Sequence, residues 1–360
     1  MVLSQLSITA LRNIASAQLT PHPSFNLIIG PNGSGKSALL EALYLLSSGR
    51  SFRASRVTQL IRKGESCATL FGVVTTSSDL QHRLGVAKRI DGSTDVSVDG
   101  VQAGSSSALA ERLAVQVVTP ESVDLIDGQP LMRRRFIDWG MFHIEPRFHA
   151  VWLHYERSLR QRNSALRQRD RRGAAAWEQS LADHGTQLAQ WRSGYVDQLR
   201  SHLAPLVAKG LLTGFDLQLQ FRPGWDQART LGEVLAATRD SDLQMGYTVA
   251  GPHRDDLLLR AQGDRAAKML SRGQKKLLVL ALLLAQFEIN HRVLGDAPIV
   301  LIDDIAAELD EGNRRFVLEH VVSLGCQLFV TGTDSEVVTR VMEPNHLFYV
   351  EQGCFRLAEH

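Results

Sequence analysis

One segment limits the possible folds of this chain more than any other. Residues 30–37 read GPNGSGKS, directly after the apolar run of residues 26–29 and directly before the apolar helical pattern of residues 38–43. A glycine-rich loop between a strand and a helix turns backbone N–H groups inward around phosphate oxygens, with its lysine at the β- and γ-phosphates and its last hydroxyl at Mg²⁺. A glycine-rich turn with an exposed lysine is the alternative, and it fits this context less well. The sequence therefore predicts a nucleoside triphosphate site formed by Gly30, Pro31, Asn32, Gly33, Ser34, Gly35, Lys36 and Ser37.

A second segment supplies acidic groups at the end of an apolar strand. Residues 297–304 read APIVLIDD. In P-loop ATPases a carboxylate after such a strand holds Mg²⁺, and a further polar group orients or activates the attacking water. Asp303 is thus the expected metal ligand beside Ser37, and Asp304 joins Lys36 as an expected catalytic group. Taken alone, a strand that ends in two aspartates is often only the start of a loop.

The composition is that of a folded soluble chain. Hydrophobic residues make up 44% and charged residues 22% of the 360 residues, which excludes the disordered and fibrous classes. Three cysteines without CxxC spacing indicate neither a disulfide framework nor a thiolate zinc site. The first residues read as a strand rather than as an export signal, and the longest apolar run, residues 277–285, is too short to span a bilayer. We therefore expect a cytoplasmic protein.

The apolar pattern divides the chain into three parts. Short β-rich segments followed by turn residues and helical pattern indicate an α/β fold at both ends. The middle has long apolar series at helical spacing from Val151 and from Trp177, and Pro205 is expected to end the second helix. It also holds all five tryptophans. We predict a head made of residues 1–122 and 245–360, with a mainly helical lobe, residues 123–244, inserted between them.

A third motif precedes the acidic strand. Residues 270–274 read LSRGQ and resemble the LSGGQ signature of ABC-type ATPases, with Arg272 in place of the second glycine. Alone, the segment could be a helix N-terminus capped by Ser271. The order of phosphate loop, signature, acidic strand and then residues 308–310, ELD, matches the ABC class. This resemblance implies an ABC-type P-loop ATPase head and a D-loop role for Asp310.

The signature also implies a dimer. Lys36 of the same chain already occupies the γ-phosphate site, so in the ABC class the signature reaches the nucleotide of a second subunit. The resemblance therefore implies that ATP joins two heads, because a ligand that binds only the joined state stabilises it. The residues expected to act in trans are Ser271, Arg272, Gly273 and Gln274.

Further motifs narrow the resemblance to one family. They are spread over nearly the whole chain and comprise LRN at residues 11–13, GRSFR at 49–53, TPE at 119–121, RRRFIDW at 133–139, GPHRDD at 251–256 and TGTD at 331–334. Together with the phosphate loop and the signature, they resemble the RecF family, SMC-like ABC-type ATPases of bacterial recombination and repair. The match is specific, because GRSFR, the arginine triplet before FIDW, and GPHRDD are not general ABC features.

The family resemblance implies roles for further residues. Arg12 and Asn13 would lie near the nucleotide, and Glu121 would belong to the loop that senses the γ-phosphate. Thr333 stands before Asp334, where transport ATPases have a histidine, which suggests slow hydrolysis suited to a switch. The resemblance implies ATP and Mg²⁺ as cofactors and a weak, DNA-stimulated ATPase activity. It also implies RecA loading on gapped DNA together with RecR and RecO, and roles in replication restart and SOS induction.

Basic residues are concentrated in parts of the chain. The net charge is +2, yet residues 133–172 hold eleven arginines and four acidic residues, a local balance of +7. Residues 50–63 add five basic residues and no acidic one, and a spacing of three would place their arginines on one helical face. Clustered arginine suits phosphate neutralisation without base readout, although a solvated arginine face gives the same pattern. With the resemblance, we expect duplex or gapped DNA to bind at Arg50, Arg53, Arg56, Arg133, Arg134 and Arg135.

Two other functions stay open at this point. The head could belong to a transport ATPase that docks on a membrane permease, although the inserted lobe and Thr333 argue against it. His253 with Asp255 and Asp256 could form the centre of an ATP-regulated, metal-dependent nuclease, although a turn at a strand edge is the more ordinary interpretation of GPHRDD. The aromatic content of 6% offers few stacking platforms, so the sequence disfavours a dedicated binder of single strands.

Overall fold

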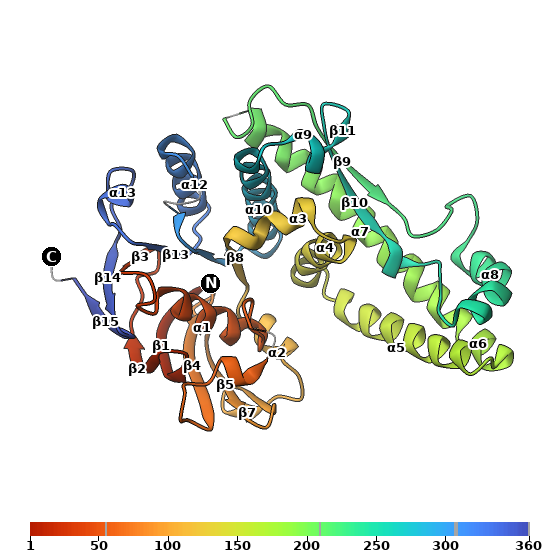
Figure 1. Ribbon diagram of the computed structural model, residues 1–360, viewed down its shortest axis with the longest axis horizontal. Coiled ribbons are helices and arrows are strands. Elements are labelled where there is room, and N and C mark those ends of the chain that lie inside the picture. The colour runs from red at the N-terminus through yellow and green to blue at the C-terminus, as the bar shows by residue number, and fades with distance from the viewer. Residues whose placement is uncertain (55, 209, 306–308, 359–360) are drawn as a thin grey trace. The chain divides into compact units, whose positions relative to one another are not determined.

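The computed structural model describes residues 1–54, 56–208, 210–305 and 309–358, which form two compact units (Figure 1). Unit 1 contains Met1–Ser122 and Asn290–His360, and unit 2 contains Val123–Ile289. The inserted part was expected to end at residue 244, but unit 2 continues through Ile289. The reason is strand pairing: β10 (Asp256–Ala261) pairs along its length with β9 (Leu217–Arg222), which keeps the chain after residue 244 in unit 2.

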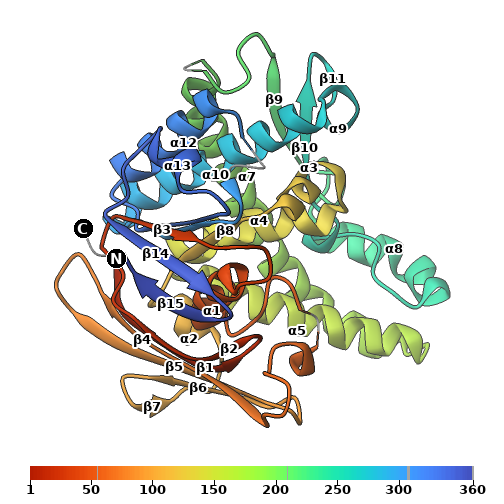
Figure 2. The same ribbon diagram turned by 60° about the vertical axis from the view of Figure 1, so that its left-hand side comes forward.

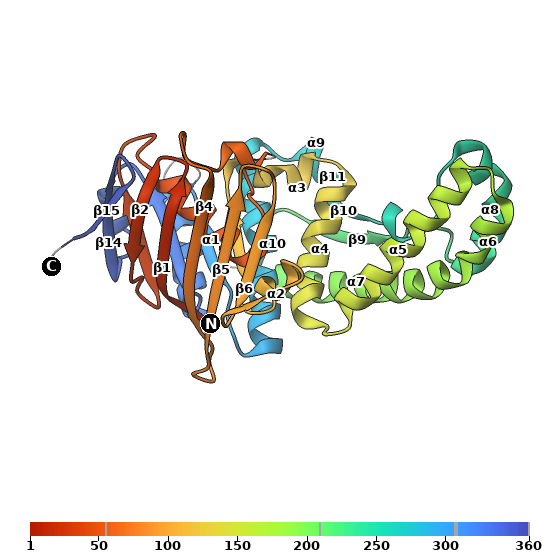
Figure 3. The same ribbon diagram turned by 90° about the horizontal axis from the view of Figure 1, so that it is seen from below.

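Unit 1 contains two six-stranded sheets. The first is antiparallel, with the strand order β2-β1-β4-β5-β6-β7 (Figure 3). Its strands are β1 (Val2–Leu11), β2 (Ile14–Leu19), β4 (Cys67–Thr75), β5 (Gln81–Arg89), β6 (Thr94–Val98) and β7 (Val101–Gln102). The second has the order β15-β14-β3-β13-β12-β8, and all its neighbours are parallel except β15 and β14. Its strands are β3 (Phe25–Ile29), β8 (Val115–Val118), β12 (Ile299–Ile302), β13 (Leu328–Gly332), β14 (His346–Glu351) and β15 (Cys354–Leu357).

The core of unit 1 lies between these sheets, around helix α1 (Lys36–Ser48), as Figure 2 shows. Strands β3, β12 and β13 are buried at every residue, which is typical of central parallel strands covered on both faces. Helix α1 is apolar on most of its surface for the same reason, because it contacts strands of both sheets. The structure also describes the helical segments η1 (Val57–Gln59), α2 (Ser107–Ala110), α12 (Glu311–Ser323) and α13 (Glu336–Thr339) in this unit.

Unit 2 is mainly helical, with a small antiparallel sheet in the order β11-β10-β9, where β11 is Asp264–Arg265. Its helical segments are α3 (Asp124–Asp127), α4 (Pro130–Ile144), α5 (Phe148–Arg167), α6 (Arg171–Ala176), α7 (Glu178–Ala208), α8 (Leu231–Met245), η3 (Pro252–Arg254) and α9 (Ala266–Met269). The division of the chain into units falls within segment η2 (Pro120–Val123) and within helix α10 (Arg272–Leu294), so each of these elements has residues in both units. Among these helices, α5 packs most extensively against α7.

The end of α7 differs from the expectation. Pro205 was predicted to end this helix, but the helix continues through it to Ala208. A proline inside a helix removes one backbone hydrogen bond. Leu203 and Leu206, on either side of Pro205, are buried, and this packing holds the last turn in place despite the missing bond.

Helix α10 carries the longest apolar run. Its length and composition would allow it to cross a membrane, but 67% of its apolar window is buried inside the protein. A soluble protein's core helix has the same pattern. Its start is capped by the signature: Ser271 Oγ accepts from Gln274 N at 3.3 Å, and Gln274 Oε1 accepts from Ser271 N at 2.8 Å.

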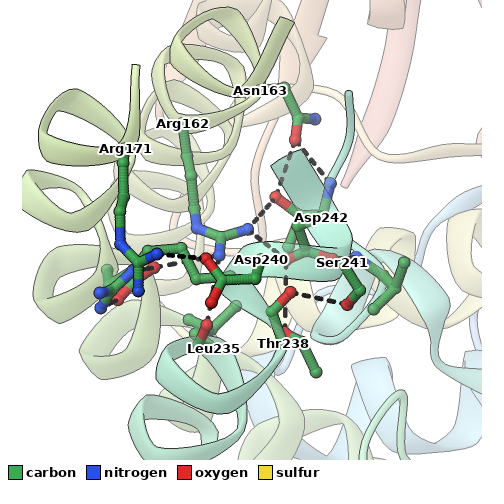
Figure 4. A network of polar contacts seen from close by, with 12 residues as sticks. Arg162, Asn163, Arg171, Leu235, Thr238, Asp240, Ser241 and Asp242 are labelled. Atoms are coloured by element: carbon green, nitrogen blue, oxygen red, sulfur yellow. Dashed lines mark hydrogen bonds and ion pairs between the residues drawn. The ribbon is translucent and has the colours of Figure 1, made fainter. Parts of the chain in front are cut away.

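A buried polar network holds the helices of unit 2 together (Figure 4). Arg162 of α5 is completely buried, and its Nη1 donates to Asp242 Oδ2 of α8 at 2.7 Å and to Thr248 Oγ1 at 2.8 Å. Its Nη2 donates to Glu178 Oε1 of α7 at 3.1 Å. One guanidinium thus joins three helical segments through buried carboxylates.

Candidate nucleotide-binding site

The phosphate loop lies between β3 and α1, as the sequence predicts. Gly33 and Gly35 have φ angles of +80° and +122°, which favour glycine strongly. A Cβ atom on Gly30 would lie 2.2 Å from the carbonyl oxygen of Val350. The loop therefore needs glycine at these positions, and its backbone N–H groups together with the N-terminus of α1 form a typical anion site.

Lys36 is only 8% exposed at the base of this loop. Its Nζ donates to the carbonyl oxygens of Gly30 at 2.6 Å and Pro31 at 3.0 Å. An ammonium group has three donors, so these two bonds leave one for a ligand. Burial lowers the pKa of Lys36, and Asp303 and Asp304 act in the opposite direction.

The acidic strand brings its carboxylates to the same edge of the sheet. Ser37 Oγ donates to Asp303 Oδ1 at 3.1 Å, and Thr331 Oγ1 donates to the same oxygen at 2.7 Å. Thr331 Oγ1 also accepts from the backbone N of Asp304 at 2.9 Å. Strands β3, β13 and β12 are parallel neighbours. The phosphate loop and Asp303 follow the carboxyl ends of β3 and β12, and Thr331 lies in the last two residues of β13, so all three lie at the same edge of the sheet.

Arg12 and Asn13 brace the loop from the first sheet. Arg12 has φ +53°, and its Nε and Nη2 donate to the two carboxylate oxygens of Glu41 at 2.8 and 2.9 Å. Glu41 is completely buried in α1, and the Ser51 hydroxyl also donates to it. Asn13 Nδ2 donates to the carbonyl oxygen of Gly33 at 3.0 Å.

These groups surround a cavity of about 680 Å³ in unit 1. Its lining includes most of the loop together with Arg12, Asn13, Asp303, Asp304, Phe52, Arg53, Thr119, Pro120 and Glu121. Glu121 lies in η2 and is exposed at the cavity. Arg53, one of the arginines expected to bind DNA, also lines this candidate nucleotide cavity.

The other site residues of the sequence analysis lie outside this cavity. Thr333 is exposed just beyond the end of β13 and does not line it, whereas Thr331, two residues earlier, contacts Asp303. Asp310 caps α12 by accepting from Asn313 N at 2.9 Å, and this bond lowers its pKa. Glu308 lies outside the described residues. Ser271, Arg272 and Gly273 are exposed at the start of α10 in unit 2.

The predicted helical face of Arg50, Arg53 and Arg56 is wrong. Helix α1 ends at Ser48, and Gly49 adopts the left-handed conformation with φ +65°. Ser51 Oγ then accepts from the backbone N of Arg53 and of Ala54, at 2.9 and 2.7 Å, and holds a turn. Such a turn competes with helix formation, so the three arginines do not share a face.

The arginine triplet of α4 divides into internal and exposed members. Arg133 Nε and Nη2 donate to the carboxylate of Asp256 at 2.7 and 3.2 Å, and Arg134 Nη1 donates to the carbonyl oxygen of Asp255 at 2.7 Å. Both side chains serve the fold of unit 2. Arg135 is exposed.

The fold and the site together define a P-loop ATPase head of the ABC type. The family described as RecF/RecN/SMC N terminal domain matches residues 2–356. The DNA replication and repair protein RecF of Pseudomonas aeruginosa (strain LESB58) is 40% identical over 358 residues, which cover 98% of this chain and 97% of that protein. RecF of Azotobacter vinelandii is also 40% identical, with 98% of each chain covered. The chain belongs to the RecF family.

Solved structures give the same relationship. The recombination mediator protein RecF with ATP, in the RecFOR pathway, has a TM-score of 0.90 at 26% identity and covers 99% of both chains. A SmcHead bound to the C-winged helix domain of ScpA has a TM-score of 0.61 at 17% identity, and the match covers 99% of this chain and 97% of the SmcHead chain. At this low identity the second likeness shows a shared fold only.

Proposed function

We propose that this protein is an ATP-dependent DNA-binding switch that acts in DNA replication and recombinational repair in the bacterial cytoplasm. The observation that carries the proposal is the convergence of Lys36, Ser37 and Asp303 at one cavity in a chain that is 40% identical to RecF over 98% of its length. RecF of Pseudomonas aeruginosa is described as a DNA replication and repair protein, and a solved RecF relative as a recombination mediator.

The cavity residues fit ATP with Mg²⁺. The loop N–H groups and Lys36 would hold the phosphates, and the buried Ser34 hydroxyl, which lacks a hydrogen-bond partner among the described residues, supports a polar ligand there. Ser37 Oγ and Asp303 Oδ1, 3.1 Å apart, are hard oxygen ligands of the kind Mg²⁺ prefers. When bound, the ion would neutralise charge that develops on the phosphates. Asp304 would orient the attacking water, and Glu121 would detect the γ-phosphate.

Thr331 would position the carboxylate of Asp303. Replacing it with valine removes one hydrogen bond to a charged oxygen and the acceptor of Asp304 N, but it preserves the side-chain shape. We expect the T331V variant to hydrolyse ATP about ten- to a hundredfold more slowly, because a hydrogen bond to a charged group contributes about 1.5–3 kcal/mol. Steady-state phosphate release measures this, with T331S as the matched control that keeps the hydroxyl. If T331V and the wild type hydrolysed ATP at equal rates, the result would contradict a positioning role for Thr331.

ATP would join two heads through the signature. Ser271, Arg272 and Gly273 are exposed and available to a second subunit, and Gln274 secures the cap of α10. In this arrangement the signature of one chain completes the phosphate site of the other. Thr333 and Asp310 would lie near this shared site. Hydrolysis of ATP would then serve to release the two heads from each other. The exposed arginines Arg50, Arg56 and Arg135 would contribute to a DNA-binding surface, without base readout.

Partners of the switch follow from the family. A solved RecF relative is described as belonging to the RecFOR pathway. We infer that this protein acts with RecR and RecO to promote RecA loading on gapped DNA. RecA loading would in turn support replication restart and SOS induction. The resident activity would be a weak ATPase that DNA stimulates.

A mixing experiment tests both the dimer and the DNA dependence. We combine K36A with S271R in equal amounts and measure ATP hydrolysis with and without gapped DNA. Half of the dimers formed at random are mixed, and each mixed dimer keeps one intact site out of two, so about a quarter of the wild-type rate should return. Each variant alone should stay inactive, and gapped DNA should raise the rate of the mixture.

Two results would contradict the proposal. No recovery on mixing would mean that the sites do not share residues between chains. A wild-type rate that ignores DNA would favour a transport ATPase subunit. A nuclease is disfavoured by the contacts of GPHRDD, since Asp255 pairs with Arg192 at 3.0 Å and Asp256 pairs with Arg133 at 2.7 Å. Among the described residues, no group of His, Cys, Asp and Glu forms a metal cluster.

A further inference from the structure

Unit 2 has a cavity of its own, which the nucleotide site does not use. It has a volume of about 490 Å³. Its walls come from the loop after β9 and from the GPHRDD turn, and they comprise Pro130, Arg222, Pro223, Gly224, Trp225, Asp226, Arg254 and Asp256. All of these residues belong to unit 2. We call this cavity the Trp225 pocket.

The pocket is built on a fixed floor. Asp255 is completely buried, and its Oδ1 accepts from the backbone N of Gly224 at 2.7 Å while Oδ2 accepts from Arg192 at 3.0 Å. Gly224 packs so closely against the turn that a Cβ atom would lie 2.0 Å from the carbonyl oxygen of Gly251. The GPHRDD motif therefore clamps the loop that carries Trp225.

The turn itself is held from its other side. His253 Nε2 donates to the carbonyl oxygen of Thr248 at 2.9 Å, and Nδ1 accepts from the Tyr155 hydroxyl at 2.6 Å. Burial lowers the pKa of His253 to about 4, so the ring is neutral at pH 7 and can play both roles. His253 and Asp255, which could have belonged to a metal site by sequence, thus hold the turn and the loop beneath the pocket in place.

The pocket offers two cations to a ligand. Arg222 and Arg254 are exposed, and neither pairs with a carboxylate within the described part of the chain. Asp256 is already neutralised by Arg133. Asp226 accepts from Ala228 N at 3.0 Å and is exposed to water. The balance of charged side chains on the open side of the pocket is therefore positive, which favours an anionic ligand.

One aromatic side chain lies in the pocket wall, and a second contacts a lining arginine. Trp225 is half-buried in its wall. Tyr247 is 44% exposed, and the Arg254 guanidinium carbon lies 5.5 Å from the centre of its ring. Aromatic side chains combined with exposed arginines are typical of surfaces that bind single-stranded nucleic acid, where bases stack and phosphates contact cations.

We propose that the Trp225 pocket binds a single-stranded stretch of nucleic acid, with a base stacked on Trp225 and the backbone phosphates at Arg222 and Arg254. The proposal rests on the DNA-binding function proposed above and extends it to the unpaired part of a gapped substrate. The low aromatic content of 6% disfavoured a binder of single strands. The structure gives a different expectation, because Trp225 shares one pocket with the exposed Arg222 and Arg254, and Arg254 also contacts Tyr247.

Fluorescence anisotropy with a labelled 15-mer of thymidine and a blunt duplex of equal length tests the pocket in the full-length protein. W225A should weaken binding of the single strand about tenfold, because loss of one stacked base has an effect of this size. W225F should retain most of the affinity, since a smaller ring can still stack. R222E changes only an exposed side chain, and it should weaken single-strand binding at least as much. Duplex affinity should change much less in all three.

The matched control is R229A, which removes an exposed arginine of the same loop that does not line the pocket. It should leave single-strand binding near wild type. Equal losses for R229A and R222E, or equal losses on duplex and single strand, would overturn the proposal. Competition with a polyglutamate peptide gives a further test. The proposal would also be overturned if this peptide displaced the single strand from the wild-type protein and bound W225A as tightly as it bound the wild type. A wild-type protein that binds duplex with ATP but not the single strand would contradict the pocket alone, whereas loss of all DNA binding would contradict the proposed function.

Discussion

Replacing Lys36 with alanine is expected to reduce ATP hydrolysis by about a hundredfold or more. Lys36 is the buried cation at the base of the phosphate loop, where its Nζ is fixed by the carbonyl oxygens of Gly30 and Pro31. A preorganised donor of this kind stabilises charge that grows in the transition state, and loss of one such donor in enzymes costs about 10²–10³ in rate. ATP is expected to raise the melting temperature of the wild type, because a ligand that binds the folded state stabilises it, and K36A should remove this rise.

K63A is the matched control for this prediction, since Lys63 is an exposed lysine of the same unit. It should hydrolyse ATP at the wild-type rate. K36R should not restore activity, because a planar guanidinium does not replace the point charge of an ammonium in a narrow loop. A K36A protein that kept a tenth of the wild-type rate would show that the loop does not carry the chemistry.

The nucleotide site could be predicted from the sequence only in part. The phosphate loop and the acidic strand are contiguous segments, so their residue types and spacing already indicate their chemistry. Thr331 could not be found in this way. Its contact with Asp303 depends on β13 lying between β3 and β12, and strand order is not written in local periodicity. Glu41 was missed for the same reason, because its partner Arg12 is 29 residues away.

The arginines show the same limit more clearly. Local charge counts treat every arginine of residues 133–172 alike, but Arg133 pairs with Asp256, which is 123 residues away in sequence. Arg162 is completely buried among carboxylates that come from α7 and α8. Arg135 is exposed, and its DNA-binding role stays a prediction. Whether an arginine binds DNA or stabilises the fold is therefore decided by long-range pairing, which needs the structure.

Replacing Arg162 with methionine is expected to destabilise unit 2 by about 3–5 kcal/mol, because removal of one partner leaves buried charges without compensation. Asp242 is 0% exposed, and among the described residues it would keep only neutral donors, from Thr238 and the backbone of Val249. Glu178 would keep Arg239. Tryptophan fluorescence during urea unfolding measures the loss, and it reports on unit 2 alone, since all five tryptophans lie within Val123–Ile289.

An exposed ion pair between α6 and α8 supplies the control. Arg171 pairs with Asp240 at 2.5 Å, but both side chains are more than half exposed, so R171A should cost less than about 1 kcal/mol (Figure 4). Adding D242N to R162M removes the stranded charge and should recover part of the lost stability, which a purely steric effect of methionine would not allow. If R162M were no more harmful than R171A, the buried network would not stabilise unit 2, and water or other side chains would compensate Asp242 instead.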